Sequence, residues 1–197
     1  MGEIRIVAGE FRRRKIRVFP GTRVRPTSDR VREALFNILG PGFEAIRALD
    51  AFAGTGALGL EALSRGAAVV TFLESDPAVV TLLRENIDRL GVVARSHVVV
   101  APAEAAIGRA LPGAPFDLVL ADPPYFDPVR APFFVSLSKS GQLSARARVV
   151  IEGDAQTRAP ALEEGGRLLL ERSARYGRTR LDFYRLGDAG PCTGSPR

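Results

Sequence analysis

Residues 45–59 read Ala-Ile-Arg-Ala-Leu-Asp-Ala-Phe-Ala-Gly-Thr-Gly-Ala-Leu-Gly. The first half is mostly apolar, and the second half follows the pattern Gly54-x-Gly56-x-x-Gly59. An apolar run that enters such a glycine pattern is typical of a buried strand that turns sharply into a helix. The glycines let the backbone approach a ligand closely, and the helix N-terminus offers it N–H groups. We therefore predict a strand, a ligand-binding loop and a helix, in that order.

The same strand–helix alternation continues downstream. Near-continuous apolar segments at 45–51, 69–74, 97–101, 116–121 and 149–152 alternate with helical patterns at 57–65, 77–90, 103–111 and 132–139. This order predicts an α/β fold with a doubly wound, mostly parallel sheet. Residues 167–173 and 179–186 are strand-like and closely spaced, so we predict an antiparallel hairpin at the sheet edge that brings the sheet to seven strands.

The N-terminal part has a different character. Short apolar patterns at 3–8 and 15–19 predict a small β-hairpin, followed by a helix that Thr27 caps and Gly40-Pro41 ends. We divide the chain into a hairpin arm at 1–26, a main domain at 27–186 and a flexible tail at 187–197.

Composition excludes several classes of protein. The 197 residues include one cysteine and one histidine, so neither an internal disulfide nor a multi-thiolate metal site is expected. We predict no bound metal. No apolar run is long enough to span a bilayer, and no secretory signal is evident, so a cytoplasmic location is expected.

Positive charge gathers in the arm. The chain carries a net charge of +6, and residues 1–25 hold eight basic side chains against two acidic ones. Clustered basic residues are typical of a surface that contacts nucleic-acid phosphates. The predicted RNA-binding residues are Arg12, Arg13, Arg14, Lys15, Arg23 and Arg25.

Two acidic residues narrow the choice of ligand. Glu74 ends the strand after the glycine pattern, 20 residues beyond Gly54, where an acid would bind ribose hydroxyls. The glycines and Glu74 leave NAD and S-adenosylmethionine both open. Asp50 favours S-adenosylmethionine, because a carboxylate is unfavourable beside a pyrophosphate and favourable beside an ammonium group.

The segment Asp122-Pro123-Pro124-Tyr125 follows the fourth predicted parallel strand, so it should lie beside the glycine loop. Prolines fix φ and cannot donate hydrogen bonds, so they would hold the Asp122 carboxylate and the Pro123 carbonyl as rigid acceptors. Such a pair can take both protons of an amino group, and Tyr125 offers a face for stacking a flipped base. The predicted catalytic residues are Asp122, Pro123, Pro124 and Tyr125.

These motifs resemble the RsmD family of bacterial methyltransferases. The resemblance covers roughly residues 3–186 and includes residues 5–9, the stretch Arg-Pro-Thr-Ser-Asp-Arg-Val-Arg-Glu at 25–33, residues 50–66 and the Asp-Pro-Pro-Tyr segment. It implies a Rossmann-like class I methyltransferase fold, S-adenosylmethionine as cofactor, and methylation of the N2 amine of one guanine in 16S ribosomal RNA. A monomer acting on a small-subunit assembly particle is expected.

The predicted cofactor set has one weak point. After the third strand, many relatives have an Asp or Asn for the adenine amine, whereas this chain has Pro102, which lacks a side-chain acceptor. We therefore assign adenine recognition to Ala103 and Glu104. The full predicted cofactor-binding set is Asp50, Phe52, Gly54, Gly56, Glu74, Ser75, Ala103 and Glu104.

Other function classes fit less well. A DNA adenine-N6 methyltransferase would use the same Asp-Pro-Pro-Tyr segment and is the main alternative. A glutamine-N5 methyltransferase usually has Asn in place of Asp122. A non-catalytic RNA-binding module would need neither Asp122 nor Glu74, and no proton donor for an NAD oxidoreductase is evident. The small chain leaves little room for a domain that reads duplex DNA, which favours structured RNA.

Overall fold

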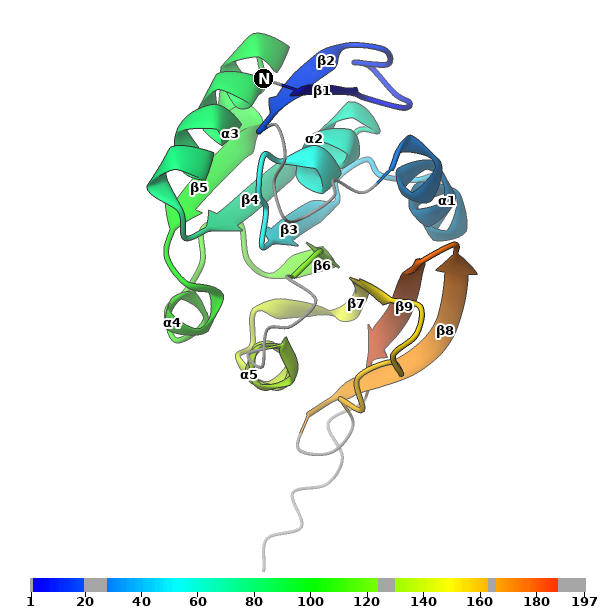
Figure 1. The fold of residues 1–197 in the computed structure, drawn as a ribbon. Coiled ribbons are helices and arrows are strands. Elements are labelled where there is room, and N and C mark those ends of the chain that lie inside the picture. Colours follow the sequence, from blue (N-terminus) through cyan, green and yellow to red (C-terminus); the bar gives the residue numbers. More distant parts are fainter. Residues whose placement is uncertain (1, 20–27, 124–129, 163–165, 188–197) are drawn as a thin grey trace, which may run out of the picture.

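A seven-stranded mixed sheet forms the centre of the protein in a computed structural model, which describes residues 2–19, 28–123, 130–162 and 166–187 (Figure 1). The strand order is β5-β4-β3-β6-β7-β9-β8. The first five strands in that order are mutually parallel, and β9 pairs antiparallel with both β7 and β8. The strands are β3 (Arg47–Ala51), β4 (Val69–Glu74), β5 (Ser96–Val100), β6 (Phe116–Ala121), β7 (Leu143–Asp154), β8 (Leu168–Tyr176) and β9 (Thr179–Leu186). The predicted doubly wound architecture and its C-terminal hairpin are confirmed.

Helices cover both faces of this sheet. On one face lie α1 (Asp29–Leu39), α2 (Ala57–Ser64) and α3 (Pro77–Leu90), and on the other lie α4 (Ala103–Ile107) and α5 (Arg130–Lys139) (Figure 1). A 3₁₀ turn, η1 (Val93–Arg95), precedes β5. Each face has its own cluster of buried apolar side chains, one with residues of α1, α2 and α3 and the other with residues of α4 and α5. Among the described residues, no helix is long and apolar enough to cross a membrane.

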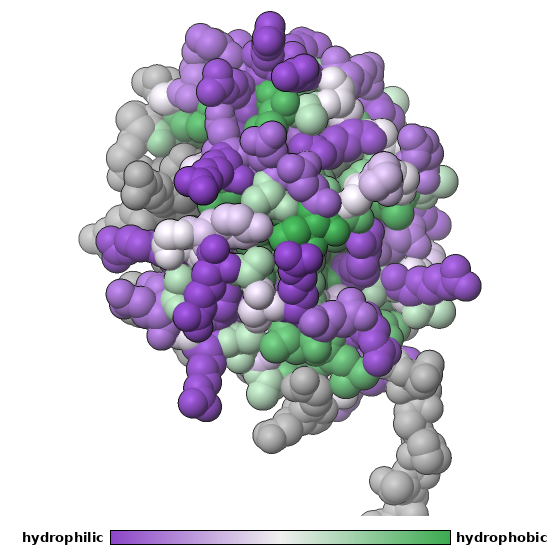
Figure 2. Space-filling model, turned by 90° about the vertical axis from the view of Figure 1, so that its right-hand side faces the viewer, coloured by the Kyte–Doolittle hydropathy of each residue, from purple (hydrophilic) through white to green (hydrophobic). Residues whose placement is uncertain are grey.

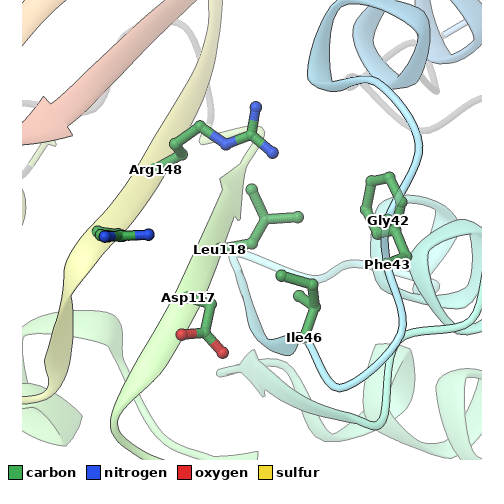
Figure 3. A pocket seen from close by; sticks show the side chains of 7 residues that line it. Gly42, Phe43, Ile46, Asp117, Leu118 and Arg148 are labelled. Carbon is green, nitrogen blue, oxygen red and sulfur yellow. The ribbon is translucent and has the colours of Figure 1, made fainter.

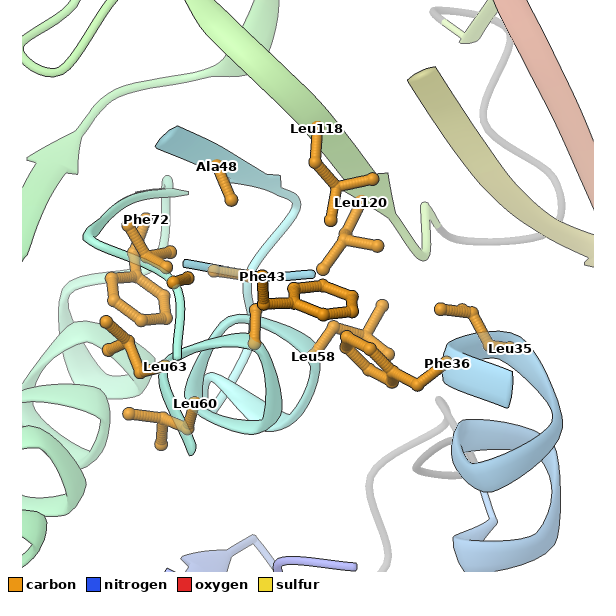
Figure 4. Packing of buried hydrophobic residues seen from close by; sticks show 14 of the residues in the cluster. Leu35, Phe36, Phe43, Ala48, Leu58, Leu60, Leu63, Phe72, Leu118 and Leu120 are labelled. Carbon is orange, nitrogen blue, oxygen red and sulfur yellow. The ribbon is translucent and has the colours of Figure 1, made fainter. Parts of the chain in front are cut away.

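The packing of α1 shows how the first face is filled. Phe36 of α1 and Phe43, which follows the helix, place their rings 5.5 Å apart and are both buried. They belong to one buried cluster with Leu58 of α2 and with Leu118 and Leu120 of β6, and Figure 4 shows these side chains together. This burial fixes α1 against the half of the sheet that carries the glycine loop.

The N-terminal strands β1 (Gly2–Arg5) and β2 (Lys15–Val18) form the predicted antiparallel hairpin. Its apolar residues Ile6 and Ile16 are each 1% exposed and belong to the same cluster as residues of α2 and α3. Buried Glu61 of α2 accepts hydrogen bonds from the N–H groups of Val7 and Ala8 at 2.7 and 3.0 Å. The hairpin is therefore built into the outer side of α2 and α3 rather than projecting from them.

Several predicted boundaries are wrong. The side chain of Ser28, not of Thr27, caps α1 by accepting from the N–H of Val31. The helix predicted at 103–111 ends at Ile107, where Gly108 follows. The strand predicted at 149–152 is the middle of β7, which is twelve residues long. The strand predicted at 167–173 continues to Tyr176.

One face of the molecule, beside β8 and α1, is shown in Figure 2. Hydrophilic side chains cover most of it, and the hydrophobic areas between them are small. Arg172, Arg175 and Arg178 of the β8–β9 hairpin are exposed, with Glu171 among them. Glu171 pairs with Arg185 at 3.4 Å, so this edge carries mixed charge rather than a purely basic surface.

Candidate active site at the carboxyl ends of the strands

The glycine loop connects β3 to α2, as predicted. Phe52, Gly54 and Gly56 all have positive φ, at 65°, 54° and 87°. A Cβ at Gly54 would meet nothing within 4 Å, whereas one at Gly56 would lie 2.6 Å from Cδ1 of Leu83. Gly54 thus faces open space where a ligand can approach, and Gly56 is required for packing of the loop against α3.

Glu74, at the end of β4, holds this loop. One of its carboxylate oxygens accepts from the N–H of Gly54 at 2.9 Å. The other accepts from the N–H groups of Ser75 and Asp76 at 2.8 and 2.9 Å. Three charge-assisted hydrogen bonds therefore fix the carboxylate beside the loop. Gly54 and Glu74, which are predicted from the sequence to belong to one ligand site, are therefore in direct contact.

Asp50 lies beneath the loop and is 1% exposed. Its carboxylate accepts a hydrogen bond from the N–H of Gly59 at 2.8 Å, so it fixes the first turn of α2. Burial raises the pKa of Asp50 well above its usual value, and the nearby carboxylates of Asp122 and Glu74 add to this, while the Gly59 N–H opposes it. The predicted contact with the cofactor's ammonium group stays a prediction.

Asp122 and Pro123 follow β6, the immediate neighbour of β3. Ala121 is the register partner of Ala51, so the two strands end side by side and Asp122 follows beside the glycine loop. Asp122 is half-buried and Pro123 is buried. Pro124 and Tyr125 lie outside the described residues.

Phe52 turns away from the loop toward the second face of the sheet. Its ring contacts the ring of Phe133 on α5 edge-on, with centroids 5.4 Å apart. This contact anchors the strained residue at φ 65° and so holds the start of the loop. Packing explains its position, and its predicted contact with a cofactor is untested.

The predicted adenine-side residues lie at the same edge. Ala101 donates to the Glu74 carbonyl at 3.1 Å, which keeps the end of β5 beside the end of β4. Ala103 is buried and Glu104 is exposed in the first turn of α4. The structure thus brings together the ends of four neighbouring strands, with acids at three of them. No group of three or more His, Cys, Asp or Glu side chains suited to a metal ion occurs within the described ranges.

The predicted RNA-binding residues separate into two groups. Arg12 and Arg13 are exposed in the turn of the hairpin. Arg14 donates to the carbonyls of Arg89 and Leu90 at the end of α3, and Lys15 pairs with Glu3 at 2.8 Å. Arg23 and Arg25 lie outside the described residues.

The hairpin turn lies at the far end of α2 from the glycine loop. The N–H of Phe11 donates to Oγ of Ser64, the last residue of α2, at 3.0 Å, and the N–H of Glu10 donates to the Ser64 carbonyl. The eight residues of α2 span about 12 Å, so Arg12 and Arg13 lie about that far from the loop. Contacts there would be with a part of the substrate remote from the reacting group.

A pocket of about 190 Å³ lies elsewhere, at the amino ends of β3 and β6 (Figure 3). Its walls include Phe43, Asp117 and Arg148. Asp117 accepts from the N–H of Arg47 at 3.0 Å, and Arg148 donates to the Leu39 carbonyl at 3.0 Å, so both groups have structural partners. This pocket is at the opposite edge of the sheet from Asp50, Glu74 and Asp122, and we assign it no part in the candidate site.

Sequence reasoning missed several polar residues that build this region. Glu61, Ser64 and Asn86 are buried side chains that join the hairpin to α2 and α3. Glu152 is 2% exposed on β7, one position beyond the Ile151–Ala121 register pair and therefore next to Asp122. The only available signal was a polar residue inside an otherwise apolar pattern.

Comparison with known proteins gives consistent matches over nearly the whole chain. The family described as Conserved hypothetical protein 95 matches residues 4–185. The Ribosomal RNA small subunit methyltransferase D of Escherichia coli strain K12 is 38% identical over 173 residues, which cover 88% of this chain and 86% of that protein. The solved yhhF protein of Escherichia coli superposes with a TM-score of 0.83 at 36% identity, covering 94% of this chain and 99% of that one.

A more distant structure supports the fold alone. The RNA methyltransferase from Salinibacter ruber, solved in complex with S-adenosyl-L-homocysteine, gives a TM-score of 0.60 at 16% identity and covers 87% of this chain and all of that one. The Rossmann-like methyltransferase fold expected from the sequence is confirmed by these neighbours.

Proposed function

The chain belongs to the RsmD family, described as Conserved hypothetical protein 95, and from that premise we propose that it is an S-adenosylmethionine-dependent methyltransferase that modifies the N2 amine of a guanine in 16S ribosomal RNA. The observation that carries this proposal is the meeting of the glycine loop, Glu74 and Asp122 at one edge of the sheet. The relatives' activity on ribosomal RNA supports the substrate class.

The residues at this edge fit the cofactor. The open space at Gly54 accommodates a ligand next to the backbone, and the Glu74 carboxylate lies beside it to accept ribose hydroxyls. Ser75, Ala103 and Glu104 line the side where adenine would lie. When bound, S-adenosylmethionine supplies an electrophilic methyl group. Burial disfavours the charged form of Asp50, and a cation bound at the near side of the loop would stabilise that form.

Asp122 and the Pro123 carbonyl are the proposed acceptors for the guanine amine. The lone pair of an exocyclic amine is delocalised into the base and is a weak nucleophile. Hydrogen bonds from both N–H groups to fixed acceptors release that lone pair and become stronger as positive charge develops on nitrogen. Tyr125 provides the stacking face for the flipped guanine in this proposal.

Ribosomal RNA is favoured over duplex DNA by the architecture. The hairpin adds two short strands to the outside of α2 and α3, and its exposed basic residues suit phosphate contacts rather than base reading. A target that is recognised by its shape, such as a folded RNA in an assembling small subunit, requires no separate reading domain. We propose that the protein acts as a monomer in the cytoplasm.

A transfer assay with methyl-labelled S-adenosylmethionine tests this proposal. The purified protein is incubated in parallel with 16S ribosomal RNA, a small-subunit particle, duplex DNA rich in adenine, and total protein. We expect label in the RNA of the first or second sample. Label in DNA would establish the adenine-N6 alternative. Calorimetry should show binding of S-adenosylhomocysteine and not of NAD, and tight binding of NAD alone would overturn the cofactor assignment.

A further inference from the structure

Asn86 is a fully buried polar residue that the proposed function does not use. It lies in the last part of α3 and has 0% exposure. Its Oδ1 accepts from the N–H of Arg17 at 2.8 Å. Its Nδ2 donates to the carbonyl of Arg17 at 2.9 Å and to the carbonyl of Thr55 at 3.0 Å. Because a backbone N–H can only donate, the Arg17 N–H fixes the orientation of the Asn86 side-chain amide. Both N–H donors of the Asn86 side chain are then used.

The two partners of Asn86 belong to different functional parts. Arg17 is in β2 of the hairpin, and Thr55 stands between Gly54 and Gly56 in the glycine loop. Asn86 binds both backbone groups of Arg17, as a neighbouring strand would. Within the described parts of the chain, no other hydrogen bond directly joins the hairpin to the loop. One side chain therefore connects them.

The loop depends on few such contacts. Its residues Gly54 and Gly56 have positive φ and are held by one hydrogen bond each from their N–H groups, to Glu74 and to the Ala53 carbonyl. The bond from Asn86 to the Thr55 carbonyl fixes the peptide that joins Thr55 to Gly56. Movement of β2 relative to α3 would first strain the two bonds between Arg17 and Asn86, and the Asn86 side chain could follow β2 only by weakening its bond to Thr55.

We propose that Asn86 is a positioning residue that couples the N-terminal hairpin to the cofactor loop, so that RNA bound by the hairpin increases the affinity of the loop for S-adenosylmethionine. The inference rests on the proposed function. RNA that contacts the hairpin turn holds β2 and Arg17 in place, and through Asn86 it reduces the motion of the Thr55 carbonyl, so the loop loses less freedom when the cofactor binds. By linkage, the cofactor increases RNA affinity by the same factor.

Binding of S-adenosylhomocysteine, measured by calorimetry with and without a 16S ribosomal RNA transcript, tests the coupling. In the parent protein, RNA should lower the dissociation constant by about fivefold or more, the size of an ordinary coupling between sites. Asn86→Ala removes three hydrogen bonds, of which one reaches the loop. It should raise the dissociation constant without RNA by about fivefold, as expected for loss of that one bond, and RNA should then have almost no effect. Asn86→Asp keeps the acceptor for the Arg17 N–H but puts an oxygen against the carbonyls of Arg17 and Thr55, so it should lose coupling as well.

Ser64→Ala is the matched control. Ser64 also anchors the hairpin, through the Phe11 N–H and the Ala8 carbonyl, but it is the last residue of α2, at the end away from the loop. This variant should lose stability and keep the RNA effect on cofactor binding. If Asn86→Ala retains the coupling of the parent, or if Ser64→Ala loses it to the same extent as Asn86→Ala, then Asn86 has only a structural role and the inference is wrong.

Hydrogen exchange on the unmodified protein gives an independent test that no folding defect can obscure. Amides of residues 53–57 should become more protected when RNA binds without cofactor. Unchanged exchange there, in a protein that binds both RNA and S-adenosylhomocysteine, would overturn the inference and leave the proposed function intact. Failure of the parent protein to bind either ligand would instead overturn the proposed function, and the inference with it.

Discussion

Three carboxylates at one edge of the sheet have three different environments, and the roles proposed for them rest on these environments. Glu74 accepts three backbone hydrogen bonds and remains next to open space at Gly54. Asp50 is buried and has a raised pKa. Asp122 is half-buried at the end of β6. The first suits a hydroxyl ligand, the second a cation, and the third the transient charge of a reacting amine.

The raised pKa of Asp50 predicts a pH dependence of stability. The folded state binds the Asp50 proton more tightly than the unfolded state, so the contribution is fully present below the unfolded pKa near 3.8 and is lost as pH rises through the raised folded pKa. Asp50→Asn removes the titration and keeps an acceptor for Gly59. Urea unfolding between about pH 4 and 8 should show the parent losing stability relative to this variant as pH rises.

Asp88→Asn, at an exposed position of α3, is the control. A constant difference between parent and Asp50→Asn would contradict the account.

Substitution of Asp122 separates catalysis from binding. Asp122→Ala should lower kcat by ~10²–10³-fold, the effect of losing one preorganised electrostatic partner, with cofactor affinity nearly unchanged. Asp122→Asn keeps an acceptor oxygen without the charge, so its kcat should lie between those of the parent and of Asp122→Ala. Single-turnover transfer on RNA gives the rate, and calorimetry gives the affinity. Full turnover by Asp122→Ala would remove the carboxylate from the mechanism.

The meeting of the main candidate residues at one edge was predictable from sequence because local spacing carries their signal. Gly54, Glu74 and Asp122 each stand at the end of a predicted strand, and parallel strands bring such ends together. Glu61 and Asn86 were not predictable, since their partners in the hairpin lie 53 to 69 residues away in the sequence. Arg32 illustrates the same limit, because its polar side chain is 1% exposed and donates to the Arg5 carbonyl at 2.7 Å.

At the scale of elements, the predictions failed where pattern and packing disagree. The first half of β7 reads Leu-Ser-Ala-Arg-Ala-Arg, which is polar enough to suggest a loop, yet Leu143 and Ala147 are buried and Arg146 and Arg148 are exposed. A strand with one face buried and the other exposed to solvent has this alternation of apolar and polar residues. The helix α4 ends early at Gly108, and the chain then supplies the Leu111 N–H to the side chain of Gln142.

The hairpin turn is the element expected to contact phosphates. Arg12→Ala with Arg13→Ala should raise the RNA dissociation constant and reduce the slope of its logarithm against log salt by about 2, one for each lost phosphate contact. Cofactor binding without RNA should not change. Filter binding over a salt series measures the slope.

A charge-matched control uses the opposite side of the sheet. Arg109→Ala with Lys139→Ala removes two exposed positive charges next to α4 and at the end of α5. This control should bind RNA with nearly the parent slope. If both double variants change the slope equally, net charge and not the hairpin accounts for RNA affinity.

At the scale of the whole molecule, the hairpin and the sheet form one packed body. Ile6, Phe11 and Ile16 are in the same apolar cluster as Leu60 and Leu83. The cluster also reaches across α1 to Phe183 of β9, near the other end of the sheet. Loss of the hairpin would therefore expose apolar surface of α2 and α3 and destabilise the fold that holds the site.

Hydrogen exchange should reveal this integration. The N–H groups of Val7 and Ala8, bonded to fully buried Glu61, should exchange only through global unfolding, with protection equal to that of β3 and β6. An arm that docks weakly would instead exchange by local opening. Much lower protection at Val7 and Ala8 than in the central strands would show that the hairpin is a separate unit.

The identity of the methylated nucleoside tests the central claim most directly. The protein is incubated with 16S ribosomal RNA or the small-subunit particle and methyl-labelled S-adenosylmethionine, the RNA is digested to nucleosides, and these are separated by mass spectrometry. We predict labelled N2-methylguanosine as the product, and its loss with Asp122→Ala under the same conditions. Label on adenine N6, on a ring carbon, or only in DNA or protein would contradict guanine-amine methylation by this site.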